Sequence, residues 1–200
     1  MIRSSAGTPP ADEPLAVPVQ VATISAKSVN ATAARGAAPK GAASQGAAPQ
    51  GAESQRRRSP RRRSREYALQ GLYQWLLAGG TPLEIAAHLA TDEHFKRADR
   101  AFFQSVLSGA IDSAAIIDPI IATHIDRPLV ELAPVEHAVL LLAGHELRSH
   151  IEAPWRVIVN EAIELSRSFG GTDGHKFVNG VLEKMARQLR PDEAWPQNST

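Results

Sequence analysis

From residue 175 to residue 189 the chain runs His-Lys-Phe-Val-Asn-Gly-Val-Leu-Glu-Lys-Met-Ala-Arg-Gln-Leu, and this stretch decides the fold class. Its apolar side chains recur three or four residues apart, the spacing of one face of an α-helix. Pro191 follows, and proline cannot continue a helix. The stretch is therefore predicted to be a helix with one buried face, formed by Val178, Val181, Leu182, Met185 and Leu189.

Helical spacing also recurs upstream, together with residues that start and stop helices. Ser64 is predicted to be the N-cap of a first helix that stops at Gly79-Gly80. Thr81-Pro82-Leu83-Glu84 combines a capping box with proline at the first helical position. No segment has the convincing alternation of a strand. We therefore predict an all-α domain over 64–191 with about seven helices, the others lying near 102–111, 116–125, 134–147 and 154–165.

Residues 1–55 differ from this domain in composition, because alanine, glycine, proline and serine dominate them. A five-residue repeat runs from Gly36-Ala-Ala-Pro-Lys to Gly51-Ala-Glu-Ser-Gln. Such a segment cannot bury enough apolar area to offset the entropy lost when its backbone becomes ordered. We predict a disordered tail over 1–55 and a short C-terminal tail over 192–200.

The charge is distributed unevenly, although the net charge is only +1. Residues 56–65 contain seven arginines and no acid, whereas residues 66–200 contain eleven Lys/Arg and eighteen Asp/Glu. Guanidinium groups form bidentate contacts with phosphate, so 56–65 is predicted to be an arginine-rich RNA-binding arm. A solvated arm or a membrane tether remains an alternative. A tether would need interleaved aromatic or leucine residues, which this block lacks.

Several kinds of chemistry are excluded or disfavoured by composition and spacing. The chain has no cysteine, which excludes disulfides and thiolate metal sites. His145 and His150 stand five residues apart, whereas two ligands of one metal on a helix need a spacing of four. The glycine-rich segment 170–176 does not have the register of a phosphate loop. We expect no enzyme activity, no cofactor and no metal, and, without a membrane span or signal peptide, a soluble cytoplasmic protein.

The start of the last predicted helix combines a cation with an aromatic ring. Lys176 and Phe177 lie in its first turn, where free backbone N–H groups can bind phosphate and an exposed ring can stack on an unpaired base. Periodicity alone favours a core position for Phe177, since apolar residues follow it at helical spacing. Tyr73 is similarly ambiguous, because it can complete the apolar stripe of the first helix or lie at its edge.

At these residues the sequence resembles the NusB family of transcription antitermination factors. The matching segments cover about 60–191 in order: Arg61-Arg62-Arg63-x-Arg65-Glu66, Leu72-Tyr73, Val135-Glu136-x-Ala138-Val139-Leu140, Asn160-Glu161-Ala162-Ile163-Glu164-Leu165, Ser168-Phe169-Gly170 and His175-Lys176-Phe177-Val178-Asn179-Gly180-Val181-Leu182. Residues 1–55 match nothing in the family, so the role of the tail and of Arg56–Arg58 stays open.

The resemblance implies a seven-helix fold of two small bundles and a heterodimer with the ribosomal protein NusE. The pair would bind the single-stranded boxA element of nascent ribosomal RNA leaders and suppress termination within the antitermination complex of elongating RNA polymerase. Glu136 would face NusE. The resemblance also moves Phe177 from the core to the RNA contacts, which would be Arg61, Arg62, Arg63, Arg65, Tyr73, Asp173, Lys176 and Phe177.

Two other functions remain as alternatives. The first is a helical scaffold that binds RNA without sequence preference. The second is the RNA-binding domain of an RNA methyltransferase that lacks its catalytic part. The methyltransferase would need a methyl-donor domain and a cysteine nucleophile, and this chain has no cysteine.

Overall fold

The structure is a computed structural model that describes residues 59–193, and these residues fold into helices without any strand. The prediction of an all-α fold with about seven helices is confirmed. The tail 1–55, Arg56–Arg58 and residues 194–200 lie outside the described residues. In chain order the helices are α2 (Pro60–Ala78), α3 (Pro82–Leu89), the 3-10 helix η1 (Glu93–Arg97), α4 (Arg100–Asp112), α5 (Ala114–Ala122), the 3-10 helix η2 (Leu129–Glu131), α6 (Pro134–Ser149), α7 (Trp155–Phe169) and α8 (Gly174–Leu189).

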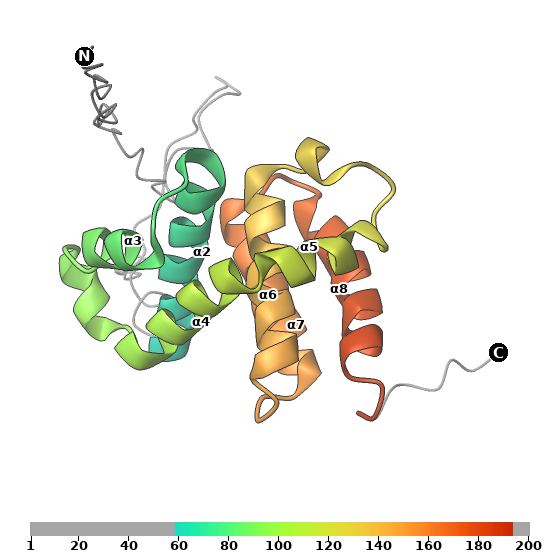
Figure 1. Ribbon diagram of the computed structural model, residues 1–200. Coiled ribbons are helices and arrows are strands. Elements are labelled where there is room, and N and C mark those ends of the chain that lie inside the picture. Colours follow the sequence, from blue (N-terminus) through green and yellow to red (C-terminus); the bar gives the residue numbers. More distant parts are fainter. Residues whose placement is uncertain (1–58, 194–200) are drawn as a thin grey trace, which may run out of the picture.

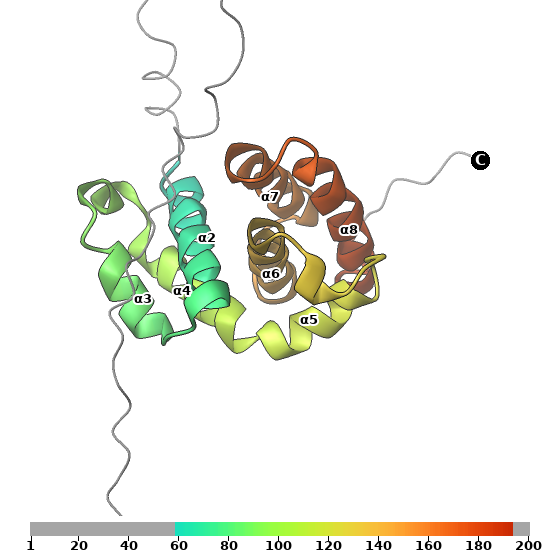
Figure 2. The ribbon, with the colours of Figure 1, turned by 90° about the horizontal axis from the view of Figure 1, so that it is seen from above.

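The helices form two small bundles that meet at α6 (Figures 1 and 2). In one bundle α2 packs on α3, η1 and α4, and in the other α6, α7 and α8 pack on one another beside α5. Helix α6 also contacts α2 and α4, so it belongs to both. Every residue from Ala138 to Leu147 in α6 is buried. The core is therefore continuous through the molecule.

The outer helices bury the stripes that the sequence predicts. On α8 the side chains of Val178, Val181, Leu182 and Met185 are at most 3% exposed. This confirms the apolar face that decides the fold class. Only the last member of the predicted stripe, Leu189, is less completely buried, because it stands in the final turn of the helix.

The first helix begins earlier than the sequence predicts. The N-cap is Ser59, whose Oγ accepts a hydrogen bond of 3.1 Å from the backbone N–H of Arg62, and Pro60 occupies the first helical position. The prediction that Ser64 is the N-cap is wrong. Ser64 is buried inside the helix, and its hydroxyl donates to the backbone carbonyl of Asp99 at 2.7 Å. The arginines from position 61 to 65 therefore lie on a helix.

Helices α4 and α5 meet at Ser113, where the chain turns sharply. The two axes are bent by 67° relative to each other. None of the helices within 59–193 is long and apolar enough to cross a membrane by itself, and only this bent pair reaches that length and composition together.

The C-terminal end of the described chain is held against α6. Arg190, just after α8, donates hydrogen bonds to the backbone carbonyls of Leu147 at 2.6 Å and His150 at 2.9 Å. Glu193 accepts hydrogen bonds from Arg190 at 2.6 Å and from the backbone N–H of Trp155 at 3.2 Å. The folded part thus extends to Glu193, two residues beyond the predicted end at Pro191.

Candidate nucleic-acid interface

The first turn of α2 presents a cluster of arginines that differ in exposure and in ion pairing. The side chain of Arg61 is 57% exposed, and its Nε lies 4.0 Å from the Asp99 carboxylate. Arg62 is only 24% exposed and forms ion pairs with Glu66 at 3.6 Å and Glu164 at 3.7 Å. Arg63 is half-buried. Of the three, Arg61 offers its charge to solvent most freely.

Arg65 lies in the interior, where acidic side chains bind its guanidinium. Its Nε and Nη2 donate to the Glu146 carboxylate at 2.8 and 2.7 Å, and Nη1 lies 3.7 Å from Glu161. Burial disfavours the charged form, but the hydrogen bonds and the attraction of the two carboxylates raise the pKa of Arg65 above its ordinary value. The guanidinium is enclosed by these carboxylates in the free protein, and its predicted contact with RNA stays a prediction.

The start of α8 places a cation beside an aromatic ring. Lys176 Nζ lies 2.8 Å from the Asp173 carboxylate, and both side chains are about three-quarters exposed, at 73% and 75%. Phe177 is half-buried and packs against the edge of the core. The ring is therefore neither a full core residue nor a free surface residue. Its contact with RNA stays a prediction.

Glu136 reaches this same end of α8 from the first turn of α6. Gly174 is buried, and a Cβ added there would lie 2.8 Å from Glu136 Oε1. A carboxylate at the N-terminus of a helix is stabilising, because the free N–H groups carry partial positive charge. Glu136 thus lies next to the start of α8, and its predicted contact with NusE stays a prediction.

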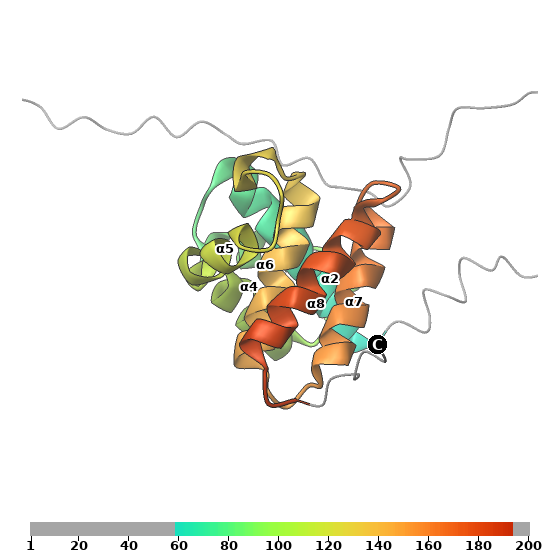
Figure 3. The same ribbon diagram turned by 90° about the vertical axis from the view of Figure 1, so that its right-hand side faces the viewer.

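The second half of α7 lies between the arginines of α2 and the start of α8. Glu164 on α7 pairs with Arg62 and also with Arg167, at 2.7 Å. Four residues separate the end of α7 at Phe169 from the start of α8 at Gly174. Seen from above, the start of α2 and the α7–α8 connection lie on the same side of the molecule (Figure 2), but along the length of the bundles they lie at opposite ends (Figures 1 and 3).

Two cations in this region, Arg167 and Arg127, are not among the site residues that the sequence predicts. Arg167 is 55% exposed, and the spacing of Glu164 and Arg167 on a helix could have indicated it. Arg127, in the connection before η2, places its guanidinium carbon 5.1 Å from the centre of the Phe177 ring. No local pattern indicates that contact, since the two residues are far apart in the sequence.

Tyr73 is not part of either cluster. It stands eleven residues after Arg62 on the same helix, which corresponds to about 16 Å along the axis. Its side chain is half-buried. The end of α2, where Tyr73 lies, is at the same end of the molecule as the starts of α6 and α8 (Figure 1). Its contact with RNA therefore stays a prediction, separate from the arginines.

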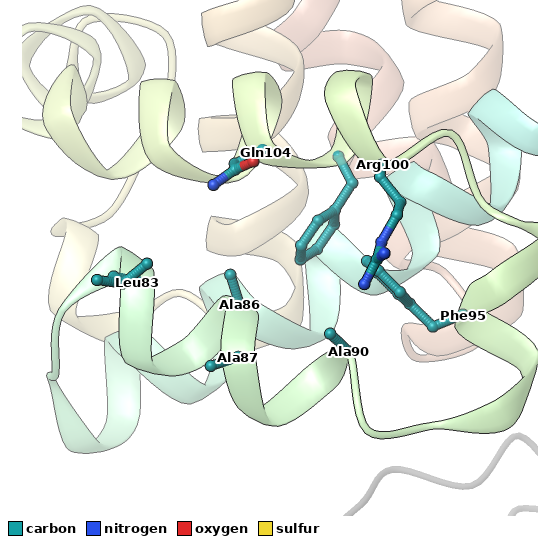
Figure 4. A pocket seen from close by; sticks show the side chains of 8 residues that line it. Leu83, Ala86, Ala87, Ala90, Phe95, Arg100 and Gln104 are labelled. Carbon is teal, nitrogen blue, oxygen red and sulfur yellow. The ribbon is translucent and has the colours of Figure 1, made fainter.

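A surface pocket lies elsewhere, between α3, η1 and α4 (Figure 4). Its volume is about 390 Å³, and none of the sequence-predicted site residues lines it. Its walls are mostly apolar, with the polar ends of Arg100 and Gln104 among them. The lining residues are Leu83, Ala86, Ala87, Ala90, Phe95, Arg100, Phe103 and Gln104.

The histidines with the predicted helical spacing of five lie near each other without forming a metal centre. The rings of His145 and His150 are 5.7 Å apart between centres. Burial, followed by the nearby His150 and Arg148, lowers the pKa of His145 to about 4. Within residues 59–193 no group of three or more His, Cys, Asp or Glu side chains is placed to hold a metal ion.

Comparisons with known proteins agree with this architecture. The model of the NusB family matches residues 62–187. The transcription antitermination protein NusB of Dechloromonas aromatica (strain RCB) is 53% identical over 130 residues, which is 65% of this chain and 80% of that protein. The NusB of Aromatoleum aromaticum is 52% identical over 130 residues, covering 65% of this chain and 90% of that one.

Solved structures show the same fold. T. maritima NusB has a TM-score of 0.57 at 27% identity, with 66% of this chain and 93% of that chain covered. A chain of the crystal structure of the antitermination factors NusB and NusE in complex with dsRNA has a TM-score of 0.59 at 25% identity, with 64% and 97% covered. The two-bundle helical fold and the match over 62–187 lead to one conclusion. This chain belongs to the NusB family.

Proposed function

We propose that this chain is a transcription antitermination factor that binds the boxA element of nascent ribosomal RNA leaders together with NusE. The observation that carries the proposal is the start of α8, where the exposed Lys176 stands beside the half-buried ring of Phe177. A cation for phosphate and a ring for an unpaired base are the two contacts by which proteins bind single-stranded RNA. The family to which the chain belongs supports the same function.

The charge distribution supports a surface that runs from the start of α2 to the start of α8. Arg61 and Arg63 would contact phosphates at one end, Lys176 and Phe177 would hold a nucleotide at the other, and Arg167 lies on the helix between them. Outside the arginine-rich segment the chain is acidic: residues 66–200, which include Arg167 and Lys176, carry eleven Lys/Arg and eighteen Asp/Glu, a net charge of −7. RNA is therefore attracted to this surface and repelled elsewhere.

NusE is the proposed protein partner, with Glu136 at the contact. A basic ribosomal protein would neutralise part of the acidic body and so increase the affinity for RNA. The chain would act as an adaptor, without chemistry of its own, that keeps the transcript RNA in the antitermination complex of elongating RNA polymerase. A related chain occurs in a crystal structure with NusE and dsRNA, which supports both kinds of partner.

The test is a titration of the full chain with labelled RNA, with and without NusE. Single-stranded boxA, a scrambled strand of equal length and a boxA duplex are compared at fixed salt. We expect the single strand to bind most tightly, and NusE to increase that affinity. Equal affinity with and without NusE would contradict the heterodimer.

The second candidate is a helical scaffold that binds RNA without sequence preference. It is favoured by the arginines at positions 61 to 63, because contacts to phosphate carry no sequence information. The same titration separates the two candidates. Equal affinity for boxA and the scrambled strand would support the scaffold and contradict the antitermination factor.

A further inference from the structure

The ring that the proposed function offers to RNA already has a partner. The guanidinium carbon of Arg127 lies 5.1 Å from the centre of the Phe177 ring, in a cation–π contact. One part of this ring packs against the core, since Phe177 is half-buried at its edge. The guanidinium thus occupies space on the ring that a stacked base would also use.

Arg127 is positioned by the short connection between α5 and α6. Directly after it, the backbone carbonyl of Pro128 accepts a hydrogen bond from Glu131 N–H at 2.9 Å, and Leu129 accepts one from Leu132 N–H at 3.1 Å. Leu132 is buried, which anchors the connection to the core. The backbone of Arg127 is therefore held near α8, while its side chain remains 45% exposed.

The cations beside the ring have the same kind of partner. Arg127 Nε lies 3.2 Å from the carboxylate of Asp126, which is 82% exposed, and Lys176 lies 2.8 Å from Asp173. Ion pairs this exposed contribute little stability and are easily exchanged. A phosphate can replace either carboxylate without leaving a buried charge unpaired. Phe177 therefore has one such cation, Arg127, over its ring and another, Lys176, next to it in the sequence.

We propose that Arg127 is a further RNA-contact residue, which covers Phe177 in the free protein and moves to a backbone phosphate when a base stacks on the ring. The proposal rests on the proposed function, since it assigns a role within the same surface. Base–aromatic stacking is stronger than a cation–π contact at an exposed site, so a base can displace the guanidinium. The displaced guanidinium then forms a charge-assisted contact with the RNA backbone.

The experiment measures boxA affinity of the full chain with NusE at several salt concentrations. Arg127→Ala should lose about tenfold in affinity at low salt and flatten the log–log salt slope by about 0.7, the value for one single-strand phosphate. Arg127→Lys should keep the slope, because it keeps the charge. The matched control is Arg156→Ala, since Arg156 also lies over a ring, that of Trp155 at 5.3 Å. It stands at the start of α7, the end remote from the start of α8, and should leave both quantities unchanged.

Each other outcome overturns the proposal. Tighter binding by Arg127→Ala would mean that the guanidinium only blocks the ring. An unchanged slope together with a lower melting temperature would mean that Arg127 only packs.

Lys176→Ala and Phe177→Ala are measured in parallel to separate the two proposals. If they weaken boxA binding while Arg127→Ala does not, the proposed function stands and the role of Arg127 is wrong. If wild-type protein shows no preference for boxA, the proposed function itself fails.

Discussion

The guanidinium of Arg65 on α2 forms a bidentate ion pair with the carboxylate of Glu146 on α6, with Nε–Oε1 and Nη2–Oε2 distances of 2.8 and 2.7 Å. The two side chains are 7% and 2% exposed. The pair joins the first helix of one bundle to the helix shared by both. It therefore fixes the start of α2, where Arg61 is exposed, relative to the shared helix.

Removal of one partner of this pair should destabilise the fold strongly. In Glu146→Gln the Arg65 guanidinium loses its main counter-charge inside the core, and we expect a loss of about 3–5 kcal/mol in the free energy of unfolding. Urea unfolding followed by circular dichroism measures this loss. The double variant Arg65→Met with Glu146→Leu should lose less than either single variant, because no buried charge is left unpaired. A loss below about 1 kcal/mol for Glu146→Gln would show that the pair does not hold the bundles together.

Stability should also depend on pH through the buried His145. Burial lowers its pKa in the folded state to about 4, against an ordinary value of 6.5. Between these values the unfolded chain binds a proton that the folded chain does not, so stability falls as pH decreases from 6.5 to 4, by about 3 kcal/mol in total. Unfolding midpoints in urea across this window measure the effect. His145→Asn, which cannot titrate, should flatten this pH dependence even if its stability at pH 7 is lower.

Asp173, which the resemblance places among the RNA contacts, should restrain RNA binding through its charge, because its exposed carboxylate forms an ion pair with Lys176 at 2.8 Å. Asp173→Asn removes that competitor for the ammonium group and one negative charge near the RNA. We expect tighter boxA binding and a salt slope that is steeper by up to about 0.7. Asp192→Asn removes an equal charge from an exposed position after α8 and serves as the control. Weaker binding by Asp173→Asn would mean that this side chain itself contacts RNA.

The sequence predicts those parts of the fold that depend on near neighbours. The Thr81–Glu84 capping box and the stripe on α8 are both local patterns, and both are present in the structure. The prediction for Ser64 is wrong because its hydroxyl donates to the carbonyls of Pro60, one turn earlier, and of Asp99, 35 residues away, instead of capping a helix. By its position in the sequence Arg65 belongs to the basic segment 56–65. Its counter-charge, Glu146, is 81 residues away, so no local pattern indicates the pair. Helical spacing and capping patterns cover only a few residues, so they do not predict partners this far apart in the sequence.

The arginines at the start of α2 should contribute to RNA binding without sequence preference. Replacing Arg61, Arg62 and Arg63 by alanine should weaken boxA and scrambled RNA alike and flatten the salt slope by about 0.7 to 2 units. The lower part of this range is expected if Arg62 keeps its pairs with Glu66 and Glu164 in the complex. Filter-binding titrations from low to moderate salt measure the slope. A loss confined to boxA would mean that these arginines contact bases.

Phe177 should contribute in a different way from the arginines, through stacking. An aromatic side chain stacked on a base contributes about 1–3 kcal/mol with little dependence on salt, so Phe177→Ala should bind boxA roughly tenfold more weakly, at an unchanged slope. Phe177→Tyr keeps the ring and should retain most of the affinity. Because the ring is only half-buried, the alanine variant should stay folded. If its stability instead falls by the 3–5 kcal/mol typical of a truncated core phenylalanine, the ring is a core residue. RNA would then be held at this end of the molecule by Lys176 and Arg127 alone. Phe177→Tyr would then bind boxA no more tightly than Phe177→Leu.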